Sequence, residues 1–138
     1  MMQRILVAYD GSEPAAKAFA LGLDLAGKYG AALYVLAIAR PPEFGEEVET
    51  EAIVENSKRH YHHILKPLQK KASAASVTIH LEVAVGHPAE QIIYHAEHHG
   101  VDLVVMGHRG RTFFERWLVG SVAKHVINHA PCAVLIAR

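Results

Sequence analysis

The sequence has a single cysteine, no excess charge of either sign and no long apolar run. Cys132 alone excludes a disulfide within these residues and a zinc site built from several cysteines, and it is typical of a reducing compartment. Fourteen basic and fourteen acidic residues cancel, which disfavours nucleic acid as a partner. Neither a secretory signal nor about 20 consecutive apolar residues are recognisable, so we expect a cytoplasmic protein that does not span a membrane.

Two catalytic patterns are also missing. Without GxxxxGK[ST], no lysine stands in a phosphate-binding loop to follow a transferred phosphoryl group, which disfavours rapid phosphoryl transfer. Without HExxH, the eleven histidines lack a familiar helical zinc pattern. Some are nevertheless spaced for chelation, at residues 60–63 and in the pairs His95 with His99 and His125 with His129. We expect surface histidines that respond to pH, with a metal site as the alternative.

Apolar patterning is abundant, at 51% hydrophobic residues, and 138 residues suit one domain, spanning 1–138. Nearly continuous apolar runs predict strands buried on both faces, whereas an alternating run predicts a strand nearer the sheet edge. The continuous runs are residues 4–9 and 32–39, the alternating run is 77–85, and the apolar residues 103–106 and 132–137 are the fourth and the last strand.

Helical spacing of apolar residues occupies the segments between these strands, at residues 13–29, 50–74, 88–99 and 122–130. Ser12 is placed to cap the first helix and Gly30 to end it. Pro67 is expected to kink or shorten the second helix, because proline removes a backbone donor. The segment 40–49 reads as a loop.

Strands that alternate with helices predict an α/β fold, a doubly wound five-stranded parallel sheet in the order 3-2-1-4-5 with helices on both faces, which is Rossmann-like. In that order a crevice opens beyond the carboxyl ends of strands 1 and 4, where ligands bind in such sheets. Asp10 and Gly107 both follow those strand ends.

The segment after the fourth strand carries the main functional signal. Gly107 and Gly110 flank His108 and Arg109, and Gly120 with Ser121 opens the last helix nine residues later. Unpaired amides at a helix start and glycines that admit close approach favour a phosphate group. Ser121 is the expected N-cap. The alternative is an ordinary strand-to-helix turn whose glycines serve packing.

Charged side chains near this loop have two readings each. Arg109 and Arg111 offset phosphate charge or remain solvated, and His108 is placed to touch phosphate. Asp10 orients ribose or metal, or acts as a base toward water.

An apolar cluster within the loop has two readings as well. Phe113, Phe114 and Trp117, with Leu118, either cover the site or join a dimer contact, or they form a docking surface for a protein partner.

The segments VAYDGSEPA and MGHRGRTFFERWLVGSVAKHV resemble the universal stress protein family over the whole chain. The glycine spacing of Gly107, Gly110 and Gly120, followed by Ser121, matches the family's ATP-binding subgroup. The resemblance implies that the loop amides and Ser121 hold the phosphates, and that Asp10 approaches ribose, phosphate or a bound magnesium ion. It also implies that the backbone near Ile38, or alternatively Ala39, meets adenine.

Met106 and Val122, beside the glycines, are expected in the same site. The resemblance further implies a homodimer formed by pairing of the last strands, residues 132–137, and a short apolar edge strand would benefit from such pairing. Many family members have proline after the position of Cys132, whereas this chain has Pro131 before it.

Three functions are therefore considered. The first is a dimeric stress-response module that binds ATP with Mg²⁺ on its phosphates, with AMP or ADP as competitors and slow or no hydrolysis. The second is an ATP hydrolase or adenylyl transferase on the same fold. The third is an interaction module without nucleotide.

Overall fold

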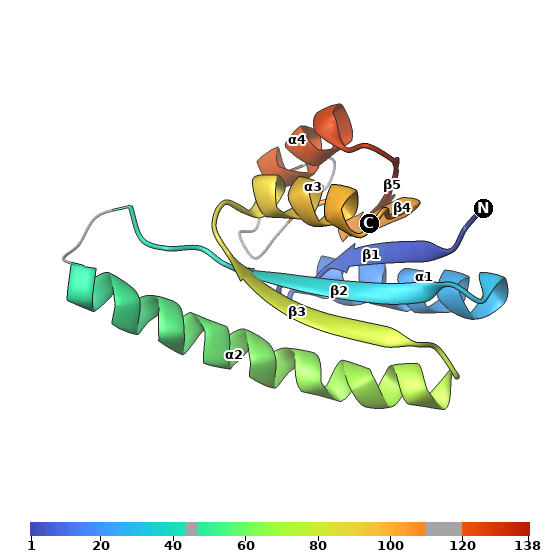
Figure 1. The fold of residues 1–138 in the computed structure, drawn as a ribbon, viewed down its shortest axis with the longest axis horizontal. Coiled ribbons are helices and arrows are strands. Elements are labelled where there is room, and N and C mark those ends of the chain that lie inside the picture. The colour runs from blue at the N-terminus through green and yellow to red at the C-terminus, as the bar shows by residue number, and fades with distance from the viewer. Residues whose placement is uncertain (44–46, 110–119) are drawn as a thin grey trace.

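The computed structural model describes residues 1–43, 47–109 and 120–138, and it contains five strands and four helices in alternation (Figure 1). The strands are β1 (Arg4–Ala8), β2 (Ala32–Ala39), β3 (Ile79–Val85), β4 (Leu103–Gly107) and β5 (Ala133–Ala137). The helices are α1 (Glu13–Tyr29), α2 (Glu47–Ala74), α3 (Pro88–His98) and α4 (Ser121–His129).

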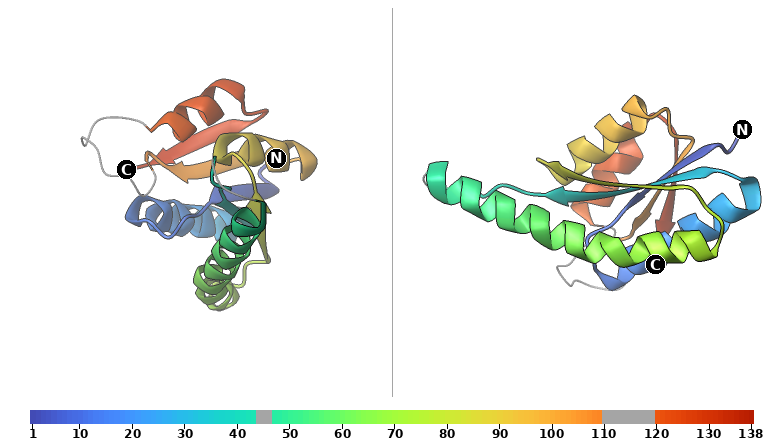
Figure 2. Two further views of the ribbon diagram at one scale, coloured as in Figure 1. Left: turned by 90° about the vertical axis from the view of Figure 1, so that its left-hand side faces the viewer. Right: turned by 60° about the horizontal axis from the view of Figure 1, so that its bottom comes forward.

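All strand pairs are parallel, in the order β3-β2-β1-β4-β5, which confirms the predicted topology and the edge position of β3. Helices α1 and α2 cover one face of the sheet, and α3 and α4 cover the other (Figures 1 and 2). Successive strand residues face opposite layers, so that Ile5 and Val7 join the α1–α2 core while Leu6 joins the α3–α4 core. Both faces are therefore buried, as the continuous apolar runs predicted.

The turn from β1 into α1 follows the expected local chemistry. Ser12 caps α1, because its Oγ accepts a hydrogen bond from the Ala15 amide at 3.2 Å. Gly11 has φ of 82°, a conformation that a side chain would strain. Gly30 ends the helix in the left-handed conformation, with φ of 65°.

Helix α2 begins at Glu47, so residues 47–49 of the predicted loop 40–49 are helical, and the helix is not shortened at Pro67. Pro67 neither ends nor divides it: the helix runs from Glu47 to Ala74 (Figure 1). Pro67 has no N–H to donate to the His63 carbonyl. Both residues are exposed, so water can hydrogen-bond to this carbonyl instead. The buried residues Leu65, Leu68 and Ala72 hold the helix on the sheet across the proline.

The predicted bounds of three strands were slightly too wide, and the first of them, β1, ends at Ala8 rather than at residue 9. Strand β3 begins at Ile79 and β5 at Ala133, so residues 77, 78 and 132 lie in the segments that precede these strands.

Asp102 ties the start of β1 to the segment before β4. Its Oδ2 accepts hydrogen bonds from the amides of Gln3, at 2.7 Å, and Arg4, at 2.9 Å. These two donors, Arg4 first and then Gln3, lower the pKa of the Asp102 carboxyl, because they favour its charged form. The bonds fix β1 at the end of the sheet opposite the predicted crevice.

Candidate functional site

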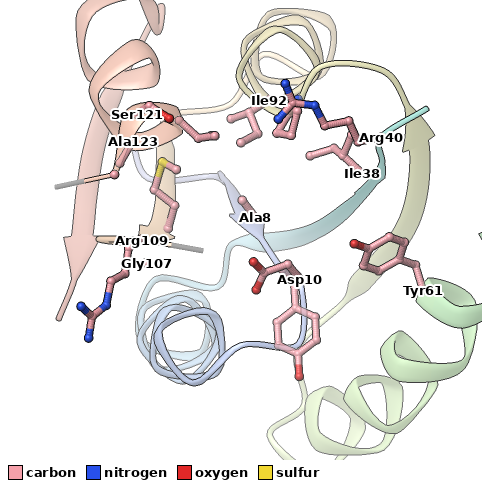
Figure 3. Close-up of a pocket in the computed structure, with 15 residues that line it drawn as sticks. Ala8, Asp10, Ile38, Arg40, Tyr61, Ile92, Gly107, Arg109, Ser121 and Ala123 are labelled. Carbon is pink, nitrogen blue, oxygen red and sulfur yellow. The ribbon is translucent and has the colours of Figure 1, made fainter. Parts of the chain in front are cut away.

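A cavity of about 420 Å³ opens beyond the carboxyl ends of the strands, which is a usual size for a small-molecule site (Figure 3). Asp10, after β1, lies near its centre (Figure 3). The ends of β2 and β4 contribute residues on either side, and the first residues of α3 and α4 and one residue of α2 complete the wall. The cavity lies at the position that the strand order predicted.

Most of the predicted site residues are brought together here. The cavity is lined by Asp10, Ile38, Met106, Gly107, Arg109, Gly120, Ser121 and Val122. Ala39, the alternative to Ile38, is fully buried and does not line it. Gly110 lies outside the described residues, as do Arg111, Phe113, Phe114, Trp117 and Leu118.

The start of α4 supplies backbone donors, although Ser121 is not its N-cap. Gly120 occupies the cap position, with φ of −64° and ψ of 159°, and Ser121 is the first helical residue. The Lys124 amide is the first to bond back into the helix, to the Gly120 carbonyl at 3.0 Å. The amides of residues 121 to 123 therefore precede the helical ladder, as donors do in anion sites at helix starts.

The glycines serve packing as well as access. A Cβ on Gly107 would lie 2.6 Å from Pro14 Cβ and 2.9 Å from its carbonyl carbon, so this position must stay bare for β4 to meet α1. At Gly120, a Cβ would lie 3.3 Å from Arg109 Cα. The Gly120 amide already donates to the His108 carbonyl at 2.6 Å. The Gly120 amide, one of the expected loop donors, is therefore already hydrogen-bonded within the protein.

His108 does not face the cavity. Its side chain is buried, and Nδ1 lies 3.2 Å from the Ala137 carbonyl oxygen, which the His108 amide also approaches at 2.8 Å. Because a carbonyl oxygen only accepts, Nδ1 carries the ring proton. The expectation that His108 touches phosphate is therefore wrong: its ring packs toward the end of β5 instead.

The charged residues of the cavity favour an anion. Among the described lining residues are two arginines, Arg40 and Arg109, and one carboxylate, Asp10. The Asp10 Oδ1 accepts a hydrogen bond from the Ser12 amide at 2.9 Å, which fixes the carboxylate at the start of α1. The Arg109 guanidinium is turned away from the cavity centre (Figure 3).

The histidine prediction was partly wrong, because His95 is buried. Its Nδ1 lies 2.8 Å from the Gln91 carbonyl oxygen, and its Nε2 lies 3.2 Å from a Glu82 oxygen that is also 3.4 Å from His99 Nε2. These contacts attach α3 to β3. No group of three or more histidine, cysteine, aspartate or glutamate side chains suited to a metal occurs among residues 1–43, 47–109 and 120–138.

Comparison with known proteins identifies the family. The universal stress protein family matches residues 1–138. A relative from Methanocaldococcus jannaschii, universal stress protein MJ0531, is 34% identical over 141 residues, covering 100% of this chain and 83% of that protein. The chain belongs to the universal stress protein family.

Solved structures of universal stress proteins share this fold. UspA from Lactobacillus plantarum superposes with a TM-score of 0.93 at 25% identity, over 99% of this chain and 98% of that one. A universal stress protein in complex with cAMP has a TM-score of 0.76 at 24% identity, covering 99% and 97%. One from Archaeoglobus fulgidus in complex with dAMP has a TM-score of 0.69 at 20% identity and covers both chains fully, at 100% and 100%. Nucleotides are therefore bound by some proteins of this fold.

Sequence reasoning missed part of the cavity wall. Tyr9, Arg40, Tyr61 and Ile92 line it, as does Pro88, at the first position of α3. Arg40 directly follows the second predicted strand, which is a usable signal. Tyr61 carries none, because its place depends on how far the long helix α2 extends along the sheet. No helix in the described segments is long and apolar enough to cross a membrane.

Proposed function

We propose that this universal stress protein is a homodimeric regulatory module of the cytoplasm that binds ATP, with AMP or ADP as competitors, and hydrolyses it slowly or not at all. The observation that carries the proposal is the convergence of helix-start amides, a central carboxylate and two arginines in one cavity. The complexes of two family members with cAMP and dAMP support an adenine nucleotide.

The phosphates bind at the β4 and α4 end of this cavity. The Ser121 hydroxyl and the amides of residues 121 to 123 donate to phosphate oxygens, and the positive end of the α4 dipole adds to the attraction. Gly110, which lies outside the described residues, is assigned to the same role from the glycine spacing. Arg109 contributes positive charge at this end.

The nucleoside lies across β1 toward the end of β2. Strands β2 and β4 flank β1, so their ends are separated by two strand spacings, about 10 Å. Asp10 stands between the two ends and meets the ribose, while the backbone near Ile38 meets adenine and Met106 and Val122 contribute apolar wall.

The residues present fit a magnesium ion carried by the nucleotide. Asp10 is the single carboxylate among the described lining residues, and Mg²⁺ usually takes one or two carboxylates together with phosphate oxygens and water. Asp10 would hold the ion, which would offset the phosphate charge. The absence of a lysine in a phosphate loop agrees with slow or absent turnover.

The central test replaces one residue at the start of α4. In Ser121→Pro, the residue loses its hydroxyl and its amide donor, yet proline is favoured at the first helical position and the extended Gly120 backbone suits a following proline. The variant should melt at or above the wild-type temperature. Its affinity for MgATP, by isothermal titration calorimetry, should fall at least tenfold, because bonds to charged groups contribute about 1.5–3 kcal/mol each.

Two controls complete this test. Ser121→Ala, which loses only the hydroxyl, should lose less affinity than Ser121→Pro. Ser73→Ala, at an exposed position on α2 outside the cavity, should bind as the wild type does. Unchanged MgATP affinity in a folded Ser121→Pro variant would contradict the proposed phosphate site. Steady phosphate release that Asp10→Asn abolishes would favour the hydrolase instead.

A further inference from the structure

Two side chains at the β2 end of the cavity are left unexplained by the phosphate site. Arg40 directly follows β2, and Tyr61 comes from the middle of α2 (Figure 3). Tyr61 lies far from Ser121 and α4, and the Arg40 side chain extends from the end of β2 toward Ile92 (Figure 3). The glycine motif assigns them no role, and their chemistry is aromatic and cationic, in contrast with the amides that hold phosphate.

Packing places the Tyr61 side chain at this end. It is half-buried against the core on the α1 and α2 face of the sheet, and it projects from α2 into the cavity (Figure 3). Ile92, only 2% exposed, approaches from α3 on the opposite face, with Pro88 beside it. The opening beyond β2 therefore has one aromatic wall and one aliphatic wall.

We propose that Tyr61 and Arg40 select a purine base in this cavity. The Tyr61 ring stacks on one face of the base, and Ile92 and Pro88 cover the other face. The Arg40 guanidinium, at the exposed mouth after β2, donates to an acceptor nitrogen on the purine edge. This inference rests on the proposed nucleotide function and adds its base specificity.

Two physical effects favour purines at such a site. Stacking on an aromatic side chain increases with the overlapping ring area, and a purine offers two fused rings where a pyrimidine offers one. Arginine has only donors, so it pairs with acceptor atoms, and both purines present the N7 acceptor that pyrimidines lack. Adenine and guanine therefore both fit the pair, and cytosine fits it poorly.

The experiment compares four ligands as magnesium complexes by isothermal titration calorimetry: ATP, GTP, CTP and inorganic tripolyphosphate. Wild-type protein should bind ATP and GTP on the order of tenfold more tightly than CTP. Tyr61→Leu keeps an apolar side chain against the core and should lose about tenfold in ATP affinity. Arg40→Gln should lose ATP affinity by a smaller factor, and Tyr61→Leu should leave tripolyphosphate binding unchanged.

Arg59→Gln is the matched control, because Arg59 is exposed on the same helix and does not line the cavity. It should bind all four ligands as the wild type does. Equal wild-type affinities for ATP and CTP, or an equal loss of ATP and tripolyphosphate affinity in Tyr61→Leu, would overturn the base assignment. Ser121→Pro separates the two proposals, because it should weaken the binding of both ATP and tripolyphosphate. If the wild-type protein binds none of the four ligands, the nucleotide function itself is overturned.

Discussion

Gly107→Ala is the sharpest test of how the glycine motif is used. The added Cβ would lie 2.6 Å from Pro14 Cβ and 2.9 Å from the Pro14 carbonyl carbon. Both distances are too short for carbon atoms, and one of the contacted atoms is backbone, so β4 and the first turn of α1 must move apart. Overpacking of this kind costs about 1–3 kcal/mol. We therefore expect Gly107→Ala to destabilise the fold whether or not nucleotide is present.

The assay is thermal unfolding of nucleotide-free protein, followed by circular dichroism. A chain of this length loses about 3 °C in melting temperature per kcal/mol, so the variant should melt about 3–10 °C lower than the wild type. Gly27→Ala is the control, because Gly27 lies inside α1 and an added Cβ there would lie 3.9 Å from Val77 Cγ2. This alanine should raise the free energy of unfolding by about 0.5–1 kcal/mol. If Gly107→Ala is as stable as the wild type and only loses nucleotide affinity, Gly107 serves the ligand and the packing argument is wrong.

Two further predictions concern acid stability and assembly. Arg4 and Gln3 lower the pKa of Asp102 in the folded protein, so the stability that its carboxylate adds is present above the unfolded pKa, near 4, and is lost as pH falls through the lower folded value. Asp102→Asn should therefore be less stable than the wild type at neutral pH, and it should lose less stability than the wild type below about pH 4. Urea unfolding measures this, and identical profiles of stability against pH for the two proteins would contradict the prediction. Ala133→Glu places a charge on an exposed residue of the edge strand β5, so it should shift the proposed dimer toward the monomer. Sedimentation velocity measures this shift, and a wild-type protein that sediments as a monomer would exclude the dimer.

The sheet was predictable because its signals are local. Runs such as residues 32–39 are apolar enough to need burial on both faces, and Ser12 and Gly30 mark helix ends through their own backbone chemistry. Once strands and helices alternate, the preference for right-handed crossovers leaves few arrangements. The site position then follows, because Asp10 and Gly107 end neighbouring strands.

The parts that could not be predicted depend on contacts distant in sequence. Pro67 is tolerated because buried residues on either side of it bind α2 to the sheet. Ser121 gives up the cap position because the Gly120 amide bonds to the His108 carbonyl. His95 is buried because Gln91 and Glu82 satisfy its ring nitrogens. None of these partners is visible in the spacing of a single motif.

His108 joins the end of β5 to the start of α4. Its carbonyl holds Gly120 at the entrance to α4, while its amide and ring meet the Ala137 carbonyl at the end of β5. The strand proposed to face a second subunit and the helix start proposed to face phosphate are thus anchored on one buried residue. A displacement of the start of α4 or of the end of β5 would therefore strain the same three hydrogen bonds.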